Sequence, residues 1–137
     1  MRFSLIKYET FNHSKTKLRY HLIFSTKFRK KCLDLIKSSI FKYCILAEIS
    51  KKTFFIETME IDKDHIHFLL TIKPSESISN VVKILKQFST YYVWKNNKNC
   101  ISKFYWKKHY LWTRGYFICT VGECSEERIK KYINEQG

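Results

Sequence analysis

The segment 62–72, DKDHIHFLLTI, constrains the fold most strongly, because it carries two alternating sets of side chains. Alternate side chains of a β-strand share one face, and successive residues rise by roughly 3.3 Å. His65 and His67 are therefore expected on one face, about 7 Å apart, with the apolar residues at positions 66, 68, 70 and 72 on the other. The segment predicts a strand with one face for packing and one for chemistry.

Periodicity predicts two more strands and a helix in the first half of the chain. Residues 18–25 alternate in character, and residues 53–61 are rich in β-branched and aromatic side chains, so both segments predict strands. Residues 62–64 form the turn of a hairpin that leads into the histidine strand. Between the first two strands, apolar residues at helical spacing predict a helix with the stripe Leu33, Ile36, Ile40, Tyr43, Cys44 and Ala47.

The second half predicts two helices and a strand. Residues 74–77, Pro-Ser-Glu-Ser, end the histidine strand and start a helix, because proline cannot continue a ladder and serine caps helices well. Residues 116–121 predict a fourth strand. Ser125 caps a last helix, with Glu126 and Glu127 in its first turn, where the helix dipole favours acidic side chains. The buried stripe of the earlier helix comprises Ile78, Val81, Val82, Leu85, Phe88 and Tyr92.

This order of elements predicts an α+β fold. Strand, helix, strand, strand, helix, strand is the pattern of the ferredoxin-like (RRM-like) antiparallel sheet, with the helices packed on one face. Residues 1–137 are expected to form one domain, with an N-terminal extension over 1–17 and an additional helix over 125–137. Parity places Arg19 and His21 on the same face as His65 and His67, and we expect this face to remain open.

Charge and aromatic content favour a nucleic-acid partner. Lysine and arginine number 26 against 12 acidic residues, which gives a net charge of +14 and points to a polyanion. Aromatic residues make up 17% of the chain, and in the segment 104–110, FYWKKHY, they lie next to basic ones. Such segments suit unpaired nucleotides, whose bases stack on rings while cations meet phosphates. The alternative is that the rings belong to the core and the lysines to a solvated surface.

Cysteine usage and hydropathy predict an intracellular protein. The five cysteines include no Cys-x-x-Cys pair, and the first residues do not resemble a signal peptide, so we expect reduced cysteines and no structural zinc. No stretch is long and apolar enough to predict a membrane span. We therefore expect a cytoplasmic protein without a membrane partner.

The residues alone leave the role of the histidines open. Two imidazoles on one strand face can bind a divalent metal, or they can serve packing and local hydrogen bonds. Tyr132 and Gln136 are four residues apart and share one helical face. The tyrosine could be a phenolic nucleophile and the glutamine a neutral ligand, or both could belong to an ordinary packed helix.

Several spaced motifs give the chain a family resemblance that covers about residues 18–136. The chain resembles the small single-tyrosine HUH transposases of the insertion sequence 200/605 family of prokaryotes. The first strand and loop of this family are similar to residues 21–31, HLIFSTKFRKK. The other motifs that carry the resemblance are DKDHIH at 62–67, LWT at 111–113 followed by TVG at 120–122, and KYINEQ at 131–136.

The resemblance implies a function and a set of site residues. It implies a DNA transposase that binds single-stranded hairpin ends of an insertion sequence, and cleaves and rejoins strands through a 5′-phosphotyrosine intermediate. Tyr132 would be the nucleophile on the helix 125–137, and His65, His67 and Gln136 the ligands of Mg2+ or Mn2+. The family further implies a homodimer, a nucleoid-associated location, and a hinge for the tyrosine helix at Gly122.

Other roles are assigned by class only. Asp62 is a candidate for orienting the histidines, whereas Asp64 is expected to shape the turn. Three alternative functions stay open: a non-catalytic single-stranded nucleic-acid-binding module, a hydrolytic phosphodiesterase in which Tyr132 is structural, and a domesticated HUH endonuclease that cuts repeat hairpins. The candidates for contacts with DNA phosphates are Arg19, Lys27, Arg29, Lys30, Lys31, Lys83 and Lys86.

Overall fold

A four-stranded antiparallel sheet forms the centre of the molecule. The structure, a computed structural model, describes residues 18–36, 41–42, 45–46 and 54–135. The strands lie in the order β2-β3-β1-β4, so β1 is central and pairs with both β3 and β4. The predicted α+β fold is confirmed, because the split β-α-β pattern requires this central first strand. The strands are β1 (Leu18–Ser25), β2 (Phe54–Ile61), β3 (His65–Ile72) and β4 (Phe117–Thr120).

The register of β1 against β3 separates an apolar face from a polar one. Leu22 lies opposite Phe68 and Phe24 opposite Ile66, and all four side chains belong to the buried core. The next residues along each strand point the other way. The predicted placement of His65 and His67 on the face away from the core is therefore confirmed.

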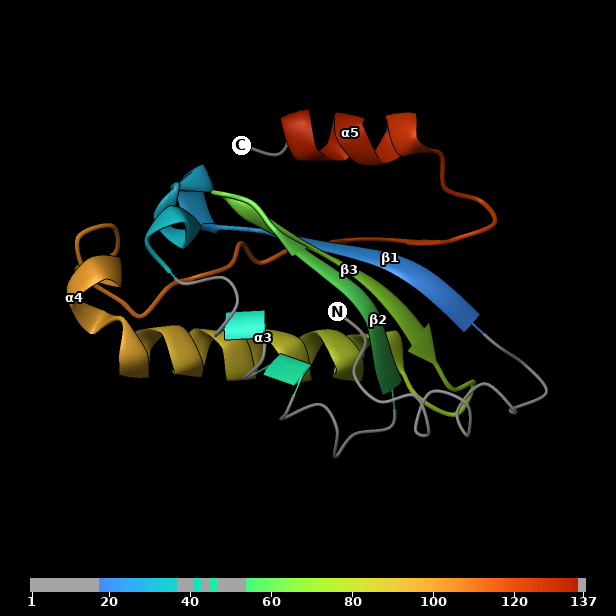
Figure 1. Cartoon of the computed structure of the whole chain (residues 1–137), viewed down its shortest axis with the longest axis horizontal. Coiled ribbons are helices and arrows are strands. Elements are labelled where there is room, and N and C mark those ends of the chain that lie inside the picture. Colours follow the sequence, from blue (N-terminus) through green and yellow to red (C-terminus); the bar gives the residue numbers. More distant parts are fainter. Residues whose placement is uncertain (1–17, 37–40, 43–44, 47–53, 136–137) are drawn as a thin grey trace.

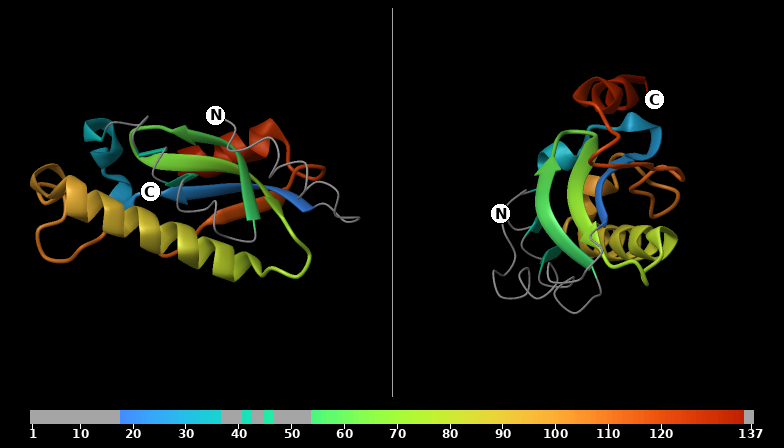
Figure 2. Two further views of the ribbon diagram at one scale, coloured as in Figure 1. Left: turned by 60° about the horizontal axis from the view of Figure 1, so that its bottom comes forward. Right: turned by 90° about the vertical axis from the view of Figure 1, so that its right-hand side faces the viewer.

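Helices cover both faces of the sheet. Helix α3 (Ile78–Asn96) runs along the apolar face, and α5 (Glu126–Glu135) lies across the histidine face, so that the strands separate the two helices (Figures 1 and 2). Ile23, on the histidine face of β1, is fully buried. The expectation that this face stays open is thus wrong where α5 crosses it, because the last helix has its own apolar contact, Ile129, to bury.

The first helix does not begin where the apolar spacing predicts. Residues after β1 form two short 3-10 helices, η1 (Lys27–Arg29) and η2 (Cys32–Leu35), and Ile36 has an extended backbone. Residues 41–42 and 45–46 are helical, with Phe41, Ile45 and Leu46 buried in the core. The predicted stripe positions Ile40, Tyr43, Cys44 and Ala47 lie outside the described residues.

Helix α3 begins where it was predicted to begin, but the residues that it buries near its end differ from the predicted ones. Ser77 caps the helix, since its Oγ accepts a hydrogen bond from the Asn80 backbone N–H at 3.1 Å. Its later turns bury Val93 and Trp94, whereas Phe88 and Tyr92 are only partly buried. A short helix, α4 (Lys98–Ile101), follows directly and was not predicted.

The connection from α4 to β4 fastens the end of β1. The Lys27 backbone N–H donates to the Leu111 carbonyl at 2.8 Å, and Thr113 N–H donates to the Ser25 carbonyl at 2.8 Å. The buried Trp112 indole N–H donates to Ser89 Oγ on α3 at 2.7 Å. The residues that follow β1 are therefore held in place by hydrogen bonds to this connection, which is itself anchored to α3.

The Ser89–Trp112 hydrogen bond is open to a direct test. We expect Ser89→Ala to lower the free energy of unfolding by roughly 1–3 kcal/mol, because it leaves a buried indole N–H without an acceptor. Urea denaturation of Ser89→Ala, Trp112→Phe and the double variant measures the coupling. The double variant should lose less than the sum of the single losses; additive losses would mean that the bond contributes nothing.

Candidate active site

His65 is fixed in a chain of polar contacts at the start of β3. Its Nδ1 lies 3.0 Å from Asp64 Oδ1, and the Arg29 Nε and Nη2 atoms donate to Asp64 Oδ2 at 3.2 and 3.1 Å. These side chains are only 13–19% exposed. Burial alone would raise the pKa of Asp64, but the His65 and Arg29 contacts lower it below its usual value, so the carboxylate is ionised. The Nε2 atom of His65 is the ring nitrogen that this contact leaves available.

The two aspartates of the hairpin turn have the opposite roles to those predicted for them. Asp62 Oδ1 accepts a hydrogen bond from the Lys63 backbone N–H at 2.7 Å, which shapes the turn. Asp64, and not Asp62, contacts the histidine. The reason is position: Asp64 directly precedes the strand, where its side chain reaches both His65 and the Arg29 side chain of η1.

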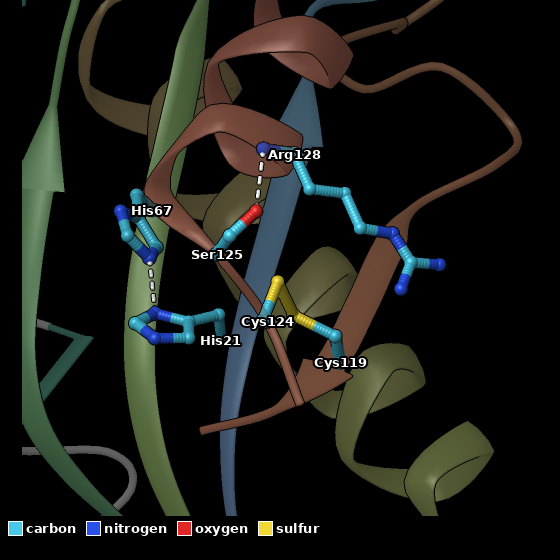
Figure 3. The surroundings of a disulfide bond; sticks show 6 residues. All are labelled: His21, His67, Cys119, Cys124, Ser125 and Arg128. Atoms are coloured by element: carbon cyan, nitrogen blue, oxygen red, sulfur yellow. Dashed lines mark hydrogen bonds between the residues drawn. A yellow bond between two sulfur atoms is a disulfide. The ribbon is translucent and has the colours of Figure 1, made fainter. Parts of the chain in front are cut away.

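A third histidine meets His67 on the same face of the sheet. His21 Nδ1 lies 2.9 Å from His67 Nε2, so one ring donates to the other (Figure 3). Burial lowers the pKa of His67, and His21 lowers it further. The pKa of His21 is lowered by burial and by Arg19. Both rings are thus held in the neutral form, which is the form that binds a metal.

Tyr132 lies on α5, over the histidine face of the sheet. Its ring centroid is 4.8 Å from that of Phe117 on β4. Burial raises the pKa of the Tyr132 phenol, and the Ser25 hydroxyl and the Arg29 guanidinium act in the opposite direction. Ser25 is the strand partner of His65. The tyrosine hydroxyl therefore lies at the same end of the sheet as the His65 contacts, within one chain.

The histidines fit the role of metal ligands in part. His65 and His67 share a face, and both rings are partly exposed. His67 Nε2 would have to exchange its contact with His21 for a metal. No group of three or more His, Cys, Asp or Glu side chains converges on one point within the described residues. Gln136, the expected third ligand, lies outside them.

A disulfide spans the predicted hinge. Cys119 at the end of β4 is bonded to Cys124, just before α5, across a turn that contains Gly122 (Figure 3). The expectation of reduced cysteines is therefore wrong for this pair. The sequence spacing gave no sign of it, because the turn folds the chain back and brings the two Cα atoms within 5.8 Å. Gly122 has no positive φ, so the observed turn does not require glycine there.

The predicted DNA contacts fall into separate groups. Lys30 and Lys31 are exposed beside the active site, whereas Arg19 is paired with Glu57 at 3.0 Å. Lys83 and Lys86 belong to α3, on the opposite side of the sheet (Figure 1). Lys86 Nζ donates to the carbonyls of residues 113–115 at 2.8, 3.0 and 3.1 Å, so its three N–H donors are engaged within the loop.

Sequence reasoning placed His21 on this face but did not assign it to the site, and it missed Ser25. The signal that could have found both is the pairing of the first and third strands. Once that register is known, Ser25 lies opposite His65 and His21 lies diagonally from His67.

Two histidines on one face of this sheet and a tyrosine helix across it form the arrangement that the resemblance to transposases predicted. The model of the family "Transposase IS200 like" matches residues 14–136, and the chain belongs to this family. The ISDra2 transposase TnpA of Deinococcus radiodurans is 32% identical over 119 residues, which cover 87% of this chain and 84% of that protein. The transposase for insertion sequence element IS200 of Salmonella typhimurium is 29% identical over 124 residues, 90% of this chain and 80% of that one.

Solved structures agree with the fold. A crystal structure of a protein from Deinococcus radiodurans, assigned as a transposase, aligns with a TM-score of 0.78 at 28% identity and covers 88% of this chain and 92% of that one. A REP-associated tyrosine transposase bound to a REP hairpin aligns with a TM-score of 0.54 at 13% identity, over 85% of this chain and 66% of that one. The second comparison supports the fold alone. Among the described residues, no helix is long and apolar enough to cross a membrane.

Removal of the Asp64 carboxylate tests the polar contacts that join Arg29, Asp64 and His65. We expect Asp64→Ala to lower the free energy of unfolding by roughly 1.5–3 kcal/mol, because the largely buried Arg29 guanidinium loses its acceptor. Asp62→Ala is the matched control and should cost only about 0.5 kcal/mol, since it removes one exposed local hydrogen bond. Urea denaturation measures both. Equal losses would contradict the roles assigned to the two aspartates.

Reduction of the disulfide tests its contribution. Closure of so short a loop stabilises a folded chain by about 2 kcal/mol in the chain-entropy model. We expect dithiothreitol to lower the free energy of unfolding by about this amount, measured by urea denaturation. The double variant Cys119→Ser/Cys124→Ser should be insensitive to the reductant. Identical curves for the native sequence with and without reductant would show that the bond does not form.

Proposed function

We propose that this transposase binds single-stranded hairpin ends of an insertion sequence and cleaves and rejoins them through a covalent bond to Tyr132. The observation that carries the proposal is the position of α5 across the histidine face, where the ring of Tyr132 packs 4.8 Å from that of Phe117 (Figure 2). Family membership implies DNA cleavage in general. The hairpin substrate, the tyrosine intermediate and the metal belong to the proposal.

The chemistry requires Tyr132 to lose its proton and attack phosphorus. A phenol with a pKa of about 10 is a weak nucleophile near neutral pH, so activation is needed. Burial makes ionisation of Tyr132 harder still, and Ser25 and Arg29 are the neighbours that ease it. The new bond joins the phenolic oxygen to phosphorus, and the bond from phosphorus to the 3′ oxygen breaks. The products are a 5′-phosphotyrosine and a free 3′-hydroxyl, so a second 3′-hydroxyl can rejoin the strand without ATP.

His65 and His67 are the residues that would hold Mg2+ or Mn2+. Neutral imidazoles are suitable ligands, and the Asp64 contact fixes the ring of His65 as orienting carboxylates do at metal sites. Gln136 remains the proposed third ligand. The chemistry that such an ion supplies when bound is polarisation of the scissile phosphate.

The proposed partners are hairpin DNA and a second copy of the chain. One relative of the same fold has been solved bound to a REP hairpin. Excision and rejoining need two cleavages, so one nucleophile per chain favours a homodimer. The cations proposed to contact DNA are those beside the tyrosine, with Lys30 and Lys31 the most accessible. Such a substrate would place the protein with the nucleoid in the cytoplasm.

Tyr132→Phe is the decisive variant. Protein, Mn2+ and single-stranded element ends are incubated and separated on a denaturing gel. We expect a protein–DNA adduct that disappears in Tyr132→Phe, because the phenyl ring has no oxygen to attack phosphorus, while hairpin binding persists. Tyr91→Phe is the matched control, since this exposed tyrosine lies on α3, and it should form the adduct normally.

The other outcomes separate the alternatives. Cleavage that persists in Tyr132→Phe would indicate a hydrolase in which the tyrosine is structural. Hairpin binding without cleavage by the native sequence would indicate a binding module. Adduct formation with repeat hairpins alone, and not with element ends, would indicate a domesticated endonuclease.

A further inference from the structure

An aromatic pocket opens beside the active site, at the end of β1. It is formed by η1 and the segment after α4, which lie at the same end of the molecule (Figure 1). Its volume is about 260 Å³, below the roughly 300–1,000 Å³ of typical small-molecule pockets. This size suits one planar group better than a large ligand. The pocket is lined by Phe28, Phe104, Tyr105, Trp106, Lys107, Lys108 and Tyr110.

Two of the lining rings are strongly exposed. The side chain of Trp106 is 75% exposed and that of Phe28 is 64% exposed. Only five large hydrophobic residues of the described part of the chain are exposed, and these two line the same pocket. Exposed apolar surface that is concentrated in this way marks a binding site more often than scattered single residues do.

The backbone holds the ring of Phe28 in this exposed position. Phe28 and Arg29 have φ values of 59° and 51°, and they are the only non-glycine residues with positive φ in the described ranges. A bulky residue in this region costs on the order of 1–3 kcal/mol, and such strain clusters at ligand-binding sites. Two hydrogen bonds maintain it: Tyr105 OH donates to the Lys27 carbonyl at 2.6 Å, and Thr26 Oγ1 donates to the Lys30 carbonyl at 2.7 Å.

The charge around the pocket is positive. Lys27 Nζ lies 5.3 Å from the ring centroid of Phe28 and 5.1 Å from that of Tyr110. Lys107 and Lys108 line the pocket and are exposed, and none of the lining residues is acidic. Apolar rings with cations close to them match a base that is attached to phosphates.

We propose that this pocket binds one unpaired nucleobase of the DNA strand held at the active site. The base stacks on Trp106 or Phe28, and Lys107, Lys108 and Lys27 contact the flanking phosphates. Phe28 directly precedes Arg29, whose guanidinium binds Asp64 and thereby supports His65. The bound base is therefore close to the scissile phosphate. The inference rests on the proposed function for the identity of the ligand as DNA.

Trp106 itself is the probe for the first experiment. Trp94 and Trp112 are 7% and 8% exposed, so a ligand-induced change in tryptophan emission reports mainly on Trp106. A short oligothymidylate is titrated into the full chain. We expect saturable quenching, because stacked bases quench the indole, and we expect Trp106→Phe to remove it. Quenching that is unchanged in Trp106→Phe would overturn the proposal.

Binding constants supply the second experiment. Stacking is worth roughly 1–3 kcal/mol per base, so Trp106→Ala and Phe28→Ala should weaken binding of oligothymidylate about 5- to 150-fold. Tyr91→Ala is the matched control, because Tyr91 is 62% exposed and has a lysine, Lys95, over its ring at 5.6 Å, but lies outside the pocket. It should bind as the native chain does. An abasic oligonucleotide should bind all four proteins equally, since it keeps the phosphates and lacks the bases.

Failure of this inference is distinguishable from failure of the proposed function. If Tyr132 forms its adduct but the pocket variants bind oligothymidylate normally, the pocket proposal is wrong and the function stands. If no adduct forms while Trp106 is quenched and the pocket variants bind weakly, the pocket binds single strands in a protein that is not a strand transferase. Circular dichroism checks that each variant folds. Should Phe28→Ala unfold, Lys107→Glu/Lys108→Glu tests the same site and should weaken binding of both oligonucleotides.

Discussion

The pairing of β1 with β3 is the constraint on which the rest of the structure depends. Side chains alternate along both strands, so a shift by one residue would bury the histidines and expose the core. The observed register sets Phe24 against Ile66 in the core and Ser25 against His65 on the other face. Since core residues favour this register by their burial, the packing of one face determines the chemistry of the other.

The polar groups of the histidine face form two connected sets. One runs from Arg29 through Asp64 to His65, and Tyr132 lies close enough to Arg29 for the guanidinium to influence its ionisation. The other joins His21 to His67. Charged groups that are partly buried are costly unless they are paired, and here the pairing also fixes side-chain orientation. The same contacts thus stabilise the loop after β1 and orient the groups that we propose to act on a phosphate.

Much of the fold follows from the sequence, and the site follows less completely. The strong alternation in β1 and β3 predicted both strands, and the cap at Ser77 predicted the start of α3. The predicted bounds differ little from the observed ones, because these signals are local in the sequence. The start of the first helix was predicted too early, because the short 3-10 helix η2 occupies Cys32–Leu35 and has no periodicity of its own, whereas residues 41–42 and 45–46 are helical. The place of two residues in the site, Asp64 and Ser25, depends on contacts between strand ends and turns. The same is true of the Cys119–Cys124 bond. Such contacts become visible only when the register and the turn geometry are known.

The position of α5 has a consequence for how Tyr132 can act. The helix contacts the sheet through few buried groups, chiefly Ile129 and the rings of Tyr132 and Phe117. A contact of this size is easily exchanged, because few apolar side chains leave water when it forms. The disulfide acts in the opposite direction, since it joins Cys124 to the end of β4 and shortens the flexible segment before the helix. While the disulfide is intact, any exchange of α5 between two chains must therefore rely on rotation at Ser125 and beyond. Once the disulfide is reduced, the turn 121–123 can also rotate.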